Sequence, residues 1–201
     1  DLLVALVARA NHIENAAAEA KIRATFDPET ETIGAHYSAL GITPRQLWDA
    51  LIEWFPKQVV GFPDAVESIK TLHARGYRLF TCTTNSSFIC RAKLYALGLA
   101  THDRSPFFTG IHGGSEVHPQ GKTTPEFFAN LLKRANAKPT DVVHVGDSPE
   151  SDLALAMQAG ITQVVLPRRS QTVEWVREAD GGIYVRSLRI LPDLVLHRRK
   201  P

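Results

Sequence analysis

The 201-residue sequence predicts an α/β fold, in which a parallel sheet carries helices on both faces and is preceded by a region of helices alone. After residue 61, short β-branched runs alternate with helical segments, as is typical of parallel sheets. The clearest run is Asp141-Val-Val-His-Val-Gly-Asp147, where a buried strand ends at a glycine and a carboxylate. The first third of the chain has no comparable run.

The helical region is read from apolar residues at helical spacing. They predict one helix from residue 1 to about 26 and another over Ile33–Leu40, which stops at Gly41. Thr43-Pro44 predicts the start of a third helix, because proline is favoured in the first turn. This helix is expected to end at Pro56. No strand is expected in this region.

The change of pattern between Pro56 and Gly61 predicts a domain boundary, with a helical domain over 1–58 and an α/β core domain over 59–201. In the core domain, glycine and proline separate the elements. The predicted strands are 77–83, 107–111, 142–145, 163–166 and 182–185. The predicted helices are 63–75, a segment ending at Gly98, 125–135, a segment from Ser148 to Gly160, and 172–178.

Size and composition allow one substantial core and exclude several kinds of protein. The net charge of +2 indicates no strong attraction to nucleic acid, and the basic end His197–Pro201 is expected to be solvated. No apolar run approaches membrane-spanning length, and the start Asp1–Arg9 lacks the pattern of a signal peptide. Cys82 and Cys90 are too few for a disulfide framework, so reduced thiols and a cytoplasmic protein are expected.

Asp147 and Asp152 are the candidate metal ligands. Asp147 follows its strand at the carboxyl end, where open α/β sheets bind ligands. Asp152 lies about one turn further on, in a helix that Ser148 or Ser151 can cap. Two carboxylates so placed suit Mg²⁺, which prefers oxygen ligands. A plain strand-to-helix turn with an Asp cap would use the same residues, so other segments must decide.

Two other segments carry polar groups that would reach the same edge. Thr84-Asn85 follows the strand 77–83, and a hydroxyl beside successive N–H groups makes an anion-binding nest. An ordinary helix cap uses the same residue types. Lys122 lies at the amino end of a helix, where a cation is unfavourable unless an anion is nearby; a solvated loop lysine is the alternative. Together the segments predict an anion and metal site.

The histidines give no further site. His12, His36, His112, His118 and His144 are not spaced as a metal motif. His144 is expected to be a strand residue, and His112 and His118 are expected in loops; no catalytic role is assigned to them.

In this order, the three segments resemble the motifs of the haloacid dehalogenase superfamily, in its phosphatase-like branch with a helical cap. The second motif of that family, an apolar strand ending in Thr or Ser, is matched by Leu79–Asn85. The third, a lysine before a helix, is matched by Lys122, although Thr123 replaces the usual proline. The fourth, Gly-Asp-Ser with a further Asp, is matched by Gly146–Ser148 and Asp152.

The resemblance covers residues 61 to about 190 and implies a Rossmann-like core with a small all-helical cap. The family's nucleophile lies in an Asp-x-Asp motif on a strand before the cap, and no Asp-x-Asp occurs in these 201 residues. The nearest sequence, Asp27-Pro-Glu29, follows a helix, and Asp1 follows no strand. The absent strand would pair with 78–83 and 142–145, whose backbone groups need partners. We therefore expect the native strand to be missing from this chain, or another segment to take its place.

With that strand present, the resemblance implies a Mg²⁺-dependent phosphatase that forms an aspartyl-phosphate. Thr84 and Asn85 would hold phosphoryl oxygens, and Lys122 would neutralise charge on the nucleophile and the phosphate. Asp147 would bind Mg²⁺, with Asp152 as a second ligand or a support. The implied partner is a small phosphorylated metabolite, without nucleic acid or membrane, and the oligomeric state stays open.

Several alternatives also stay open. A hydrolytic 2-haloacid dehalogenase would share Lys122 and the core but would not require Mg²⁺. A catalytically inactive binding protein would fit the absent nucleophile. A phosphomutase or a phosphonate-cleaving relative is compatible with the same motifs.

Overall fold

The computed structural model describes residues 2–25 and 33–196. Asp1, Asp27-Pro-Glu29 and the basic end His197–Pro201, which entered the sequence-based expectations, lie outside the described residues. Within the described residues, no helix is long and apolar enough to cross a membrane.

The chain divides into two compact units. The described residues up to Val60 form the helical unit together with Phe88–Arg104, and Gly61–Ser87 forms the α/β unit together with the described residues from Ser105 onward. The sequence predicted a single boundary between Pro56 and Gly61. In the structure, the chain passes from the helical unit to the α/β unit after Val60. It then returns to the helical unit for Phe88–Arg104, which packs in the apolar cluster of that unit.

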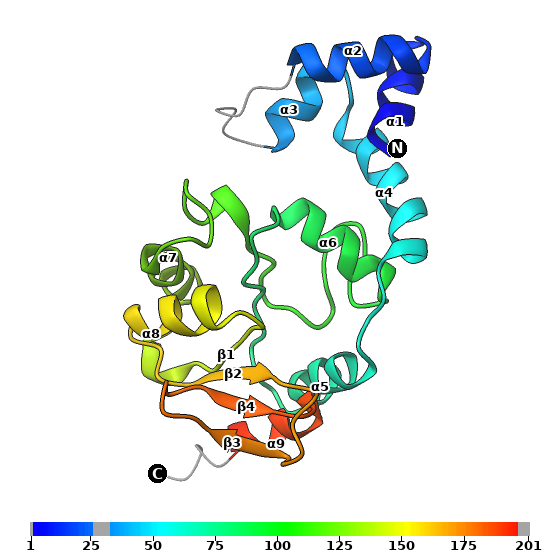
Figure 1. Cartoon of the computed structure of the whole chain (residues 1–201). Helices are drawn as coiled ribbons and strands as arrows, with labels where there is room; N and C mark the ends of the chain where they lie inside the picture. The colour runs from blue at the N-terminus through cyan, green and yellow to red at the C-terminus, as the bar shows by residue number, and fades with distance from the viewer. Residues whose placement is uncertain (1, 26–32, 197–201) are drawn as a thin grey trace. The chain divides into compact units, whose positions relative to one another are not determined.

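The helical unit is built around a buried apolar cluster that includes Leu6, Val7, Leu40, Leu51 and Ala92. Helices α1 and α2 pack against each other, and α4 packs against α1 and α3. Its helices are α1 (Leu2–Asn11), α2 (Asn15–Thr25), α3 (Ile33–Ala39), α4 (Pro44–Gln58) and nearly all of α6 (Ser87–Ala96) (Figure 1).

The single helix expected over residues 1 to 26 is wrong, because the chain turns between α1 and α2. His12 takes a left-handed conformation with φ 55°, and this conformation interrupts a right-handed helix. The Asn11 amide donates to the carbonyls of Val7 at 2.9 Å and Leu40 at 2.8 Å, which satisfies acceptors at the end of α1. Lys21 donates to the Asn11 oxygen from α2. The side chain of Asn11 thus stabilises the turn.

Helix α4 starts where the sequence predicted and ends later. The Thr43 hydroxyl accepts from the Gln46 backbone N–H while the Gln46 side chain accepts from the Thr43 N–H, a reciprocal cap. The helix continues through Pro56 to Gln58, so the expected end at Pro56 is wrong. Proline removes only one donor there, and the N–H of Val59 still reaches the carbonyl of Phe55 at 2.7 Å.

Trp48 on α4 explains why Phe88–Arg104 belongs to the helical unit. Its ring is 3% exposed and makes edge contacts with the rings of Phe88, Tyr95 and His102, at centroid distances of 5.8, 5.7 and 4.8 Å. Such edge-to-face pairs stabilise beyond the area they bury. Trp48 is therefore a core residue of the helical unit.

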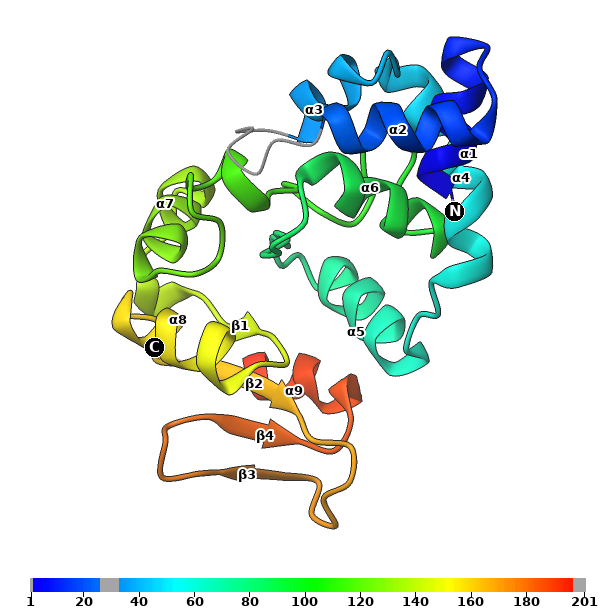
Figure 2. The same ribbon diagram turned by 45° about the horizontal axis from the view of Figure 1, so that its top comes forward.

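The α/β unit contains a four-stranded sheet in the order β1-β2-β4-β3. Its strands are β1 (His144–Val145), β2 (Val164–Pro167), β3 (Trp175–Arg177) and β4 (Ile183–Val185). The pairs β1–β2 and β2–β4 are parallel, whereas β3 pairs antiparallel with β4 (Figure 2). The predicted α/β class is confirmed, and the strands expected at 142–145, 163–166 and 182–185 are present, the first shortened to two residues.

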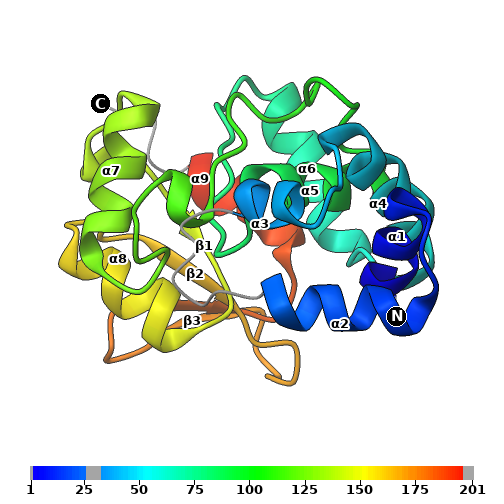
Figure 3. The same ribbon diagram turned by 90° about the horizontal axis from the view of Figure 1, so that it is seen from above.

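Helices cover both faces of the sheet, as predicted (Figure 3). Val164 and Leu166 of β2 face a cluster with Phe127, Phe128 and residues of the helix after β1. Val165 faces the opposite cluster, because side chains alternate along a strand. The helices on the first face are α7 (Pro125–Ala135) and α8 (Leu155–Gln158), and those on the second are α5 (Pro63–Ala74) and α9 (Leu191–Leu196). Short 3₁₀ turns occupy Gly114–Glu116, Pro139–Asp141 and Leu188–Ile190.

The helix expected over 172–178 is wrong, since this segment contains β3. Exposure alternates along it: Trp175 and Arg177 are exposed, and Val176 packs into the core. A period of two is the pattern of a strand with one buried face. The turn to β4 uses Gly181 at φ 87°, and the N–H of Glu178 donates to the carbonyl of Gly182. This glycine turn favours a hairpin.

The strands expected at 77–83 and 107–111 are also wrong as regular strands. The two segments meet only in isolated parallel bridges, Phe80 with Gly110 and Thr83 with Gly113. The N–H of Thr81 donates to the Gly110 carbonyl at 3.1 Å. In an extended chain, the N–H and C=O groups of successive residues point to opposite edges. The N–H and C=O groups of Phe80 therefore face away from the segment around Gly110. No other described segment pairs with that side.

Candidate active site

The fourth-motif segment links β1 to the helix behind it. Gly146 follows β1, and the Ser148 hydroxyl accepts from the Ser151 N–H at 3.1 Å, which caps the π-helical turn Pro149–Ala154. The sequence-based prediction that Ser148 or Ser151 caps this helix is confirmed for Ser148. The turn places the side chain of Asp152 against Gly146, the residue that follows β1.

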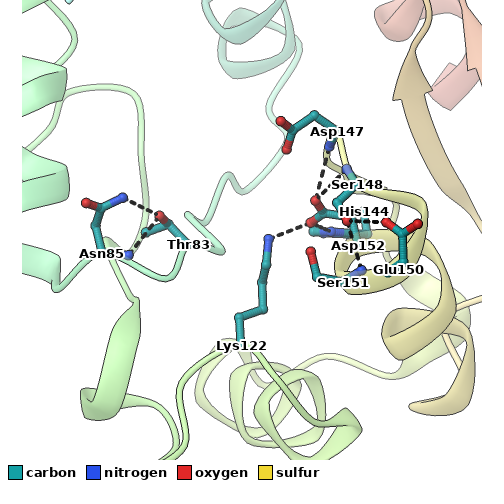
Figure 4. Close-up of polar contacts among 9 residues, drawn as sticks. All are labelled: Thr83, Asn85, Lys122, His144, Asp147, Ser148, Glu150, Ser151 and Asp152. Atoms are coloured by element: carbon teal, nitrogen blue, oxygen red, sulfur yellow. Dashed lines mark hydrogen bonds and ion pairs between the residues drawn. The ribbon is translucent and has the colours of Figure 1, made fainter.

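Asp152 is the centre of the site, with 1% of its surface exposed. One carboxylate oxygen, Oδ1, lies 2.7 Å from Lys122 Nζ and 2.8 Å from His144 Nε2. The other, Oδ2, accepts the backbone N–H groups of Asp147 and Ser148, each at 3.1 Å. Four donors therefore hold a carboxylate that water does not reach (Figure 4).

These contacts keep Asp152 ionised. Burial by itself opposes the charge and acts to raise the pKa. The hydrogen bonds from His144 and Lys122 outweigh burial, and the net pKa of Asp152 lies well below its ordinary value. A buried charge of this kind requires partners, and Lys122 supplies the opposite charge.

Gly146 is required by the position of Asp152. A Cβ atom on Gly146 would lie 2.0 Å from Asp152 Cγ and 2.2 Å from its Oδ1. The carboxylate thus occupies the volume of the missing side chain, which explains the glycine between β1 and Asp147 in physical terms.

Lys122 reaches Asp152 from the loop before α7 and is 9% exposed. The sequence indicated that a cation here needs an anion nearby, and Asp152 is that anion. Figure 4 shows the ammonium between Asp152 and the turn that contains Thr83 and Asn85. Lys122 and Asp152 are therefore brought together from segments 30 residues apart.

In the second-motif turn, Thr83 rather than Thr84 holds Asn85. The Thr83 Oγ1 accepts from both the backbone N–H and the side-chain amide of Asn85, each at 3.2 Å. Thr84 is exposed. Beneath the turn, a Cβ atom on Gly113 would lie 2.3 Å from the Asn85 carbonyl oxygen, so the backbones are in close contact.

Asp147 and Asp152 have different environments, although both were candidate metal ligands. Asp147 is exposed, and its carboxylate points away from that of Asp152 (Figure 4). Both oxygens of Asp152 are engaged by donors. Across residues 2–25 and 33–196, no cluster of three His, Cys, Asp or Glu side chains could hold a metal. Of the two candidate ligands, only Asp147 is accessible, and a single carboxylate fits Mg²⁺, since this ion commonly binds one or two carboxylates, waters and substrate phosphate.

Sequence reasoning missed His144. Its ring is 8% exposed and stands edge-on to Phe128 at a centroid distance of 5.1 Å. A histidine inside the apolar run Val-Val-His-Val was the available signal, because a polar ring on a buried strand needs a hydrogen-bond partner. Cys82 lies near the site as well, but burial raises the pKa of its thiol to about 12, so it stays neutral.

Comparison with known proteins identifies the family. The haloacid dehalogenase-like hydrolase family matches residues 9–160. This match covers most of the chain, and the protein belongs to that family. The resemblance inferred from the three motifs is confirmed.

Curated relatives include several phosphatases. A phosphoglycolate phosphatase from Rhodospirillum rubrum is 32% identical over 127 residues, which are 62% of this chain and 50% of the relative. A glyceraldehyde 3-phosphate phosphatase from Methanocaldococcus jannaschii is 31% identical over 140 residues, 69% of this chain and 58% of the relative. The chain thus spans about half the length of the curated relatives it matches.

Solved structures share the fold. A phosphatase of this family from Thermococcus onnurineus has a TM-score of 0.59 at 22% identity, with 96% of this chain and 86% of that chain covered. A 2-haloacid dehalogenase from Pseudomonas syringae has a TM-score of 0.57 at 25% identity, with 92% and 68% covered. The two scores are nearly equal, so the fold does not separate phosphatase from dehalogenase chemistry.

Proposed function

We propose that this chain forms part of a Mg²⁺-dependent phosphoric monoester hydrolase that acts through an aspartyl-phosphate. The observation that carries the proposal is the buried Lys122–Asp152 ion pair beside the exposed carboxylate of Asp147, at the carboxyl end of β1. A lysine and a metal ligand at one edge are what a phosphate dianion needs near carboxylates.

Each residue has a proposed role. Lys122 neutralises phosphoryl charge with the ammonium protons that Asp152 does not engage. Thr84 and Asn85 hold phosphoryl oxygens at the turn, with Thr83 fixing the turn through its bonds to Asn85. Asp147 holds the Mg²⁺, which offsets the negative charge of substrate and nucleophile. Asp152 supports the site by holding Lys122.

The nucleophile has to come from outside these residues, because the sequence has no Asp-x-Asp. We place it on a strand between β1 and the segment Leu79–Thr83. The N–H groups of His144 and Gly146 donate to Gln163, just before β2, and to Val165 in β2, so the N–H of Val145 points to the opposite edge. Leu79 and Val145 line the same apolar cluster. A strand at this edge would pair backbone groups on both sides and end beside Asp147.

The helical unit is proposed to act as a cap that selects the substrate, a small phosphorylated metabolite. Support for this class of substrate comes from the relatives named as phosphoglycolate and glyceraldehyde 3-phosphate phosphatases. Loss of water from a capped site strengthens its charge interactions. The residues of the cap would determine which leaving group of the phosphate ester is accepted.

The test combines intact mass and activity. The natural protein is purified from its source, its mass is compared with that of these 201 residues, and hydrolysis of para-nitrophenyl phosphate is measured with and without Mg²⁺. A heavier protein that carries Asp-x-Asp should hydrolyse the ester only with Mg²⁺. In it, Lys122→Ala and Asp147→Asn should each lower kcat/KM at least about 100-fold. Unchanged rates in both variants would rule out the proposed site.

Two other outcomes identify other functions. Release of halide from 2-chloropropionate without any requirement for Mg²⁺ would instead identify a dehalogenase, since a 2-haloacid dehalogenase from Pseudomonas syringae has the same fold. A natural protein with the mass of these 201 residues and no hydrolytic activity would identify a binding protein on the same fold, a function favoured by the absent Asp-x-Asp.

A further inference from the structure

His144 is a buried polar side chain to which the proposed mechanism gives no role. Its neighbours Val143 and Val145 face the cluster that packs on α5 and α9. Alternation along β1 directs His144 to the other face, where its ring meets Phe128 edge-on. An aliphatic residue would suit this position equally well by packing alone.

The contact with Asp152 distinguishes His144 from a packing residue. The Nε2 atom lies 2.8 Å from Asp152 Oδ1, the same oxygen that Lys122 Nζ approaches at 2.7 Å. An ionised carboxylate can only accept, so Nε2 carries the hydrogen and donates. Two donors from different segments therefore share one oxygen atom.

The second oxygen of Asp152 faces the backbone N–H groups of Asp147 and Ser148, which cannot move independently of the turn. His144 is fixed by β1 and by Phe128. Lys122 is the flexible partner, because its side chain has four rotatable carbons and comes from a loop. The carboxylate, held at both oxygens, sets the direction of the ammonium.

We propose that His144 is a positioning residue, which orients the Asp152 carboxylate and through it holds the Lys122 ammonium at the place where the phosphoryl group binds. The inference rests on the proposed function only in identifying the anion as a phosphoryl group. Without the donor at Nε2, the carboxylate can rotate and Lys122 follows it.

Three variants separate the hydrogen bond from packing. His144→Phe keeps a ring against Phe128 and removes the donor. His144→Gln places an amide N–H near the Nε2 position and restores the donor. His112→Phe is the matched control, since His112 is a partly buried histidine stacked on Phe80 at 6.1 Å. Amide NMR spectra of the full 201-residue chain verify that each variant is folded.

The first readout is the NMR signal of the Lys122 ammonium group, which is visible when a salt bridge slows its proton exchange. The wild-type chain, His144→Gln and His112→Phe should show the signal, and His144→Phe should lose it. A signal that survives in His144→Phe would overturn the inference, whatever the chain binds. This measurement needs no activity and no metal.

The second readout is the dissociation constant of inorganic phosphate, measured by calorimetry. His144→Phe should raise it about tenfold, as expected for a hydrogen bond to a charged group, and His144→Gln should return it to within about threefold of wild type. If Lys122→Ala does not weaken phosphate binding, the proposed function fails. If Lys122→Ala weakens it and His144→Phe does not, only the role of His144 fails.

Discussion

At the scale of single residues, Asp147 and Asp152 belong to one motif but have different environments. Both are carboxylates in the same short segment, yet Asp147 is exposed and Asp152 is buried under four donors. An accessible carboxylate can bind a metal ion, whereas a buried one can orient neighbouring side chains through its hydrogen bonds. The same substitution should therefore affect stability strongly at Asp152 and little at Asp147.

Asp152→Asn should lower the free energy of unfolding by about 3 kcal/mol, because it leaves Lys122 buried without a counter-charge and turns an N–H₂ toward other donors. Asp147→Asn should change it by less than about 0.5 kcal/mol, as for most exposed positions. Urea denaturation of the 201-residue chain at pH 7 measures both. Equal losses in the two variants would contradict the division of roles.

The sequence identified the segments of the site but not their pairwise contacts. Lys122 and Asp152 could be assigned to one edge because parallel strands end there. The bond between Thr83 and Asn85 could not be predicted, since it depends on which of two adjacent hydroxyls the turn directs inward. His144 could not be assigned a role, because its contact with Asp152 depends on the π-helical turn Pro149–Ala154, which contains Asp152.

At the scale of elements, Asp64 joins three segments of the α/β unit. It lies in the first turn of α5 and is 7% exposed. Arg169, which follows β2, binds it through two hydrogen bonds of 2.8 and 3.1 Å. The Ser187 hydroxyl and the Leu188 N–H, after β4, each donate at 2.9 Å. We name these four residues the Asp64 clamp.

The clamp should make stability depend on pH in the acid range. The hydrogen bonds from Arg169 hold the pKa of Asp64 well below its ordinary value, despite burial. A carboxylate with a depressed folded-state pKa stabilises fully above its unfolded pKa of about 3.9 and loses that contribution as the pH falls below it. Asp64→Asn should therefore cost about 2 kcal/mol at pH 7 and progressively less below about pH 4.

Urea denaturation of the wild type and Asp64→Asn between pH 7 and pH 3 measures this dependence. Asp49→Asn, at an exposed position on α4, is the matched control and should change stability by less than about 0.5 kcal/mol. A cost of Asp64→Asn that stays constant down to pH 3 would mean that charge is not the source of the stabilisation.

Elements with a strong local signal were predictable, and those set by tertiary pairing were not. Helix α7 begins at Pro125 and ends before Asn136, whose left-handed conformation is a typical helix stop. The sequence of Thr172–Glu178 is compatible with the periods of both a helix and a strand, and pairing of β3 with β4 decides the outcome. The segment 77–83 has the composition of a strand, but the described residues provide no second neighbouring strand for it.

At the scale of the whole α/β unit, two extended segments expose backbone groups on one side. Among residues 2–25 and 33–196, β1 pairs only with β2, at one end of the sheet. Within the same residues, Leu79–Thr83 pairs only with the chain around Gly110 and Gly113. In the described part of the chain, the N–H groups of Phe80, Cys82 and Val145 donate no hydrogen bond, although these residues are partly buried. Buried backbone donors normally have partners.

Hydrogen exchange should therefore alternate along both segments. In the 201-residue chain, the amides of Val145 and Cys82 should exchange faster than those of His144 and Thr81, whose N–H groups bond to Gln163 and Gly110. Residue-resolved NMR exchange measures this pattern. In a longer natural protein that carries the proposed strand, Val145 and Cys82 should become protected by at least about 100-fold, because opening a paired central strand requires more free energy than opening an edge. Similar protection of alternate residues in the short chain would mean that both edges are already paired, and then no place remains for the nucleophile strand.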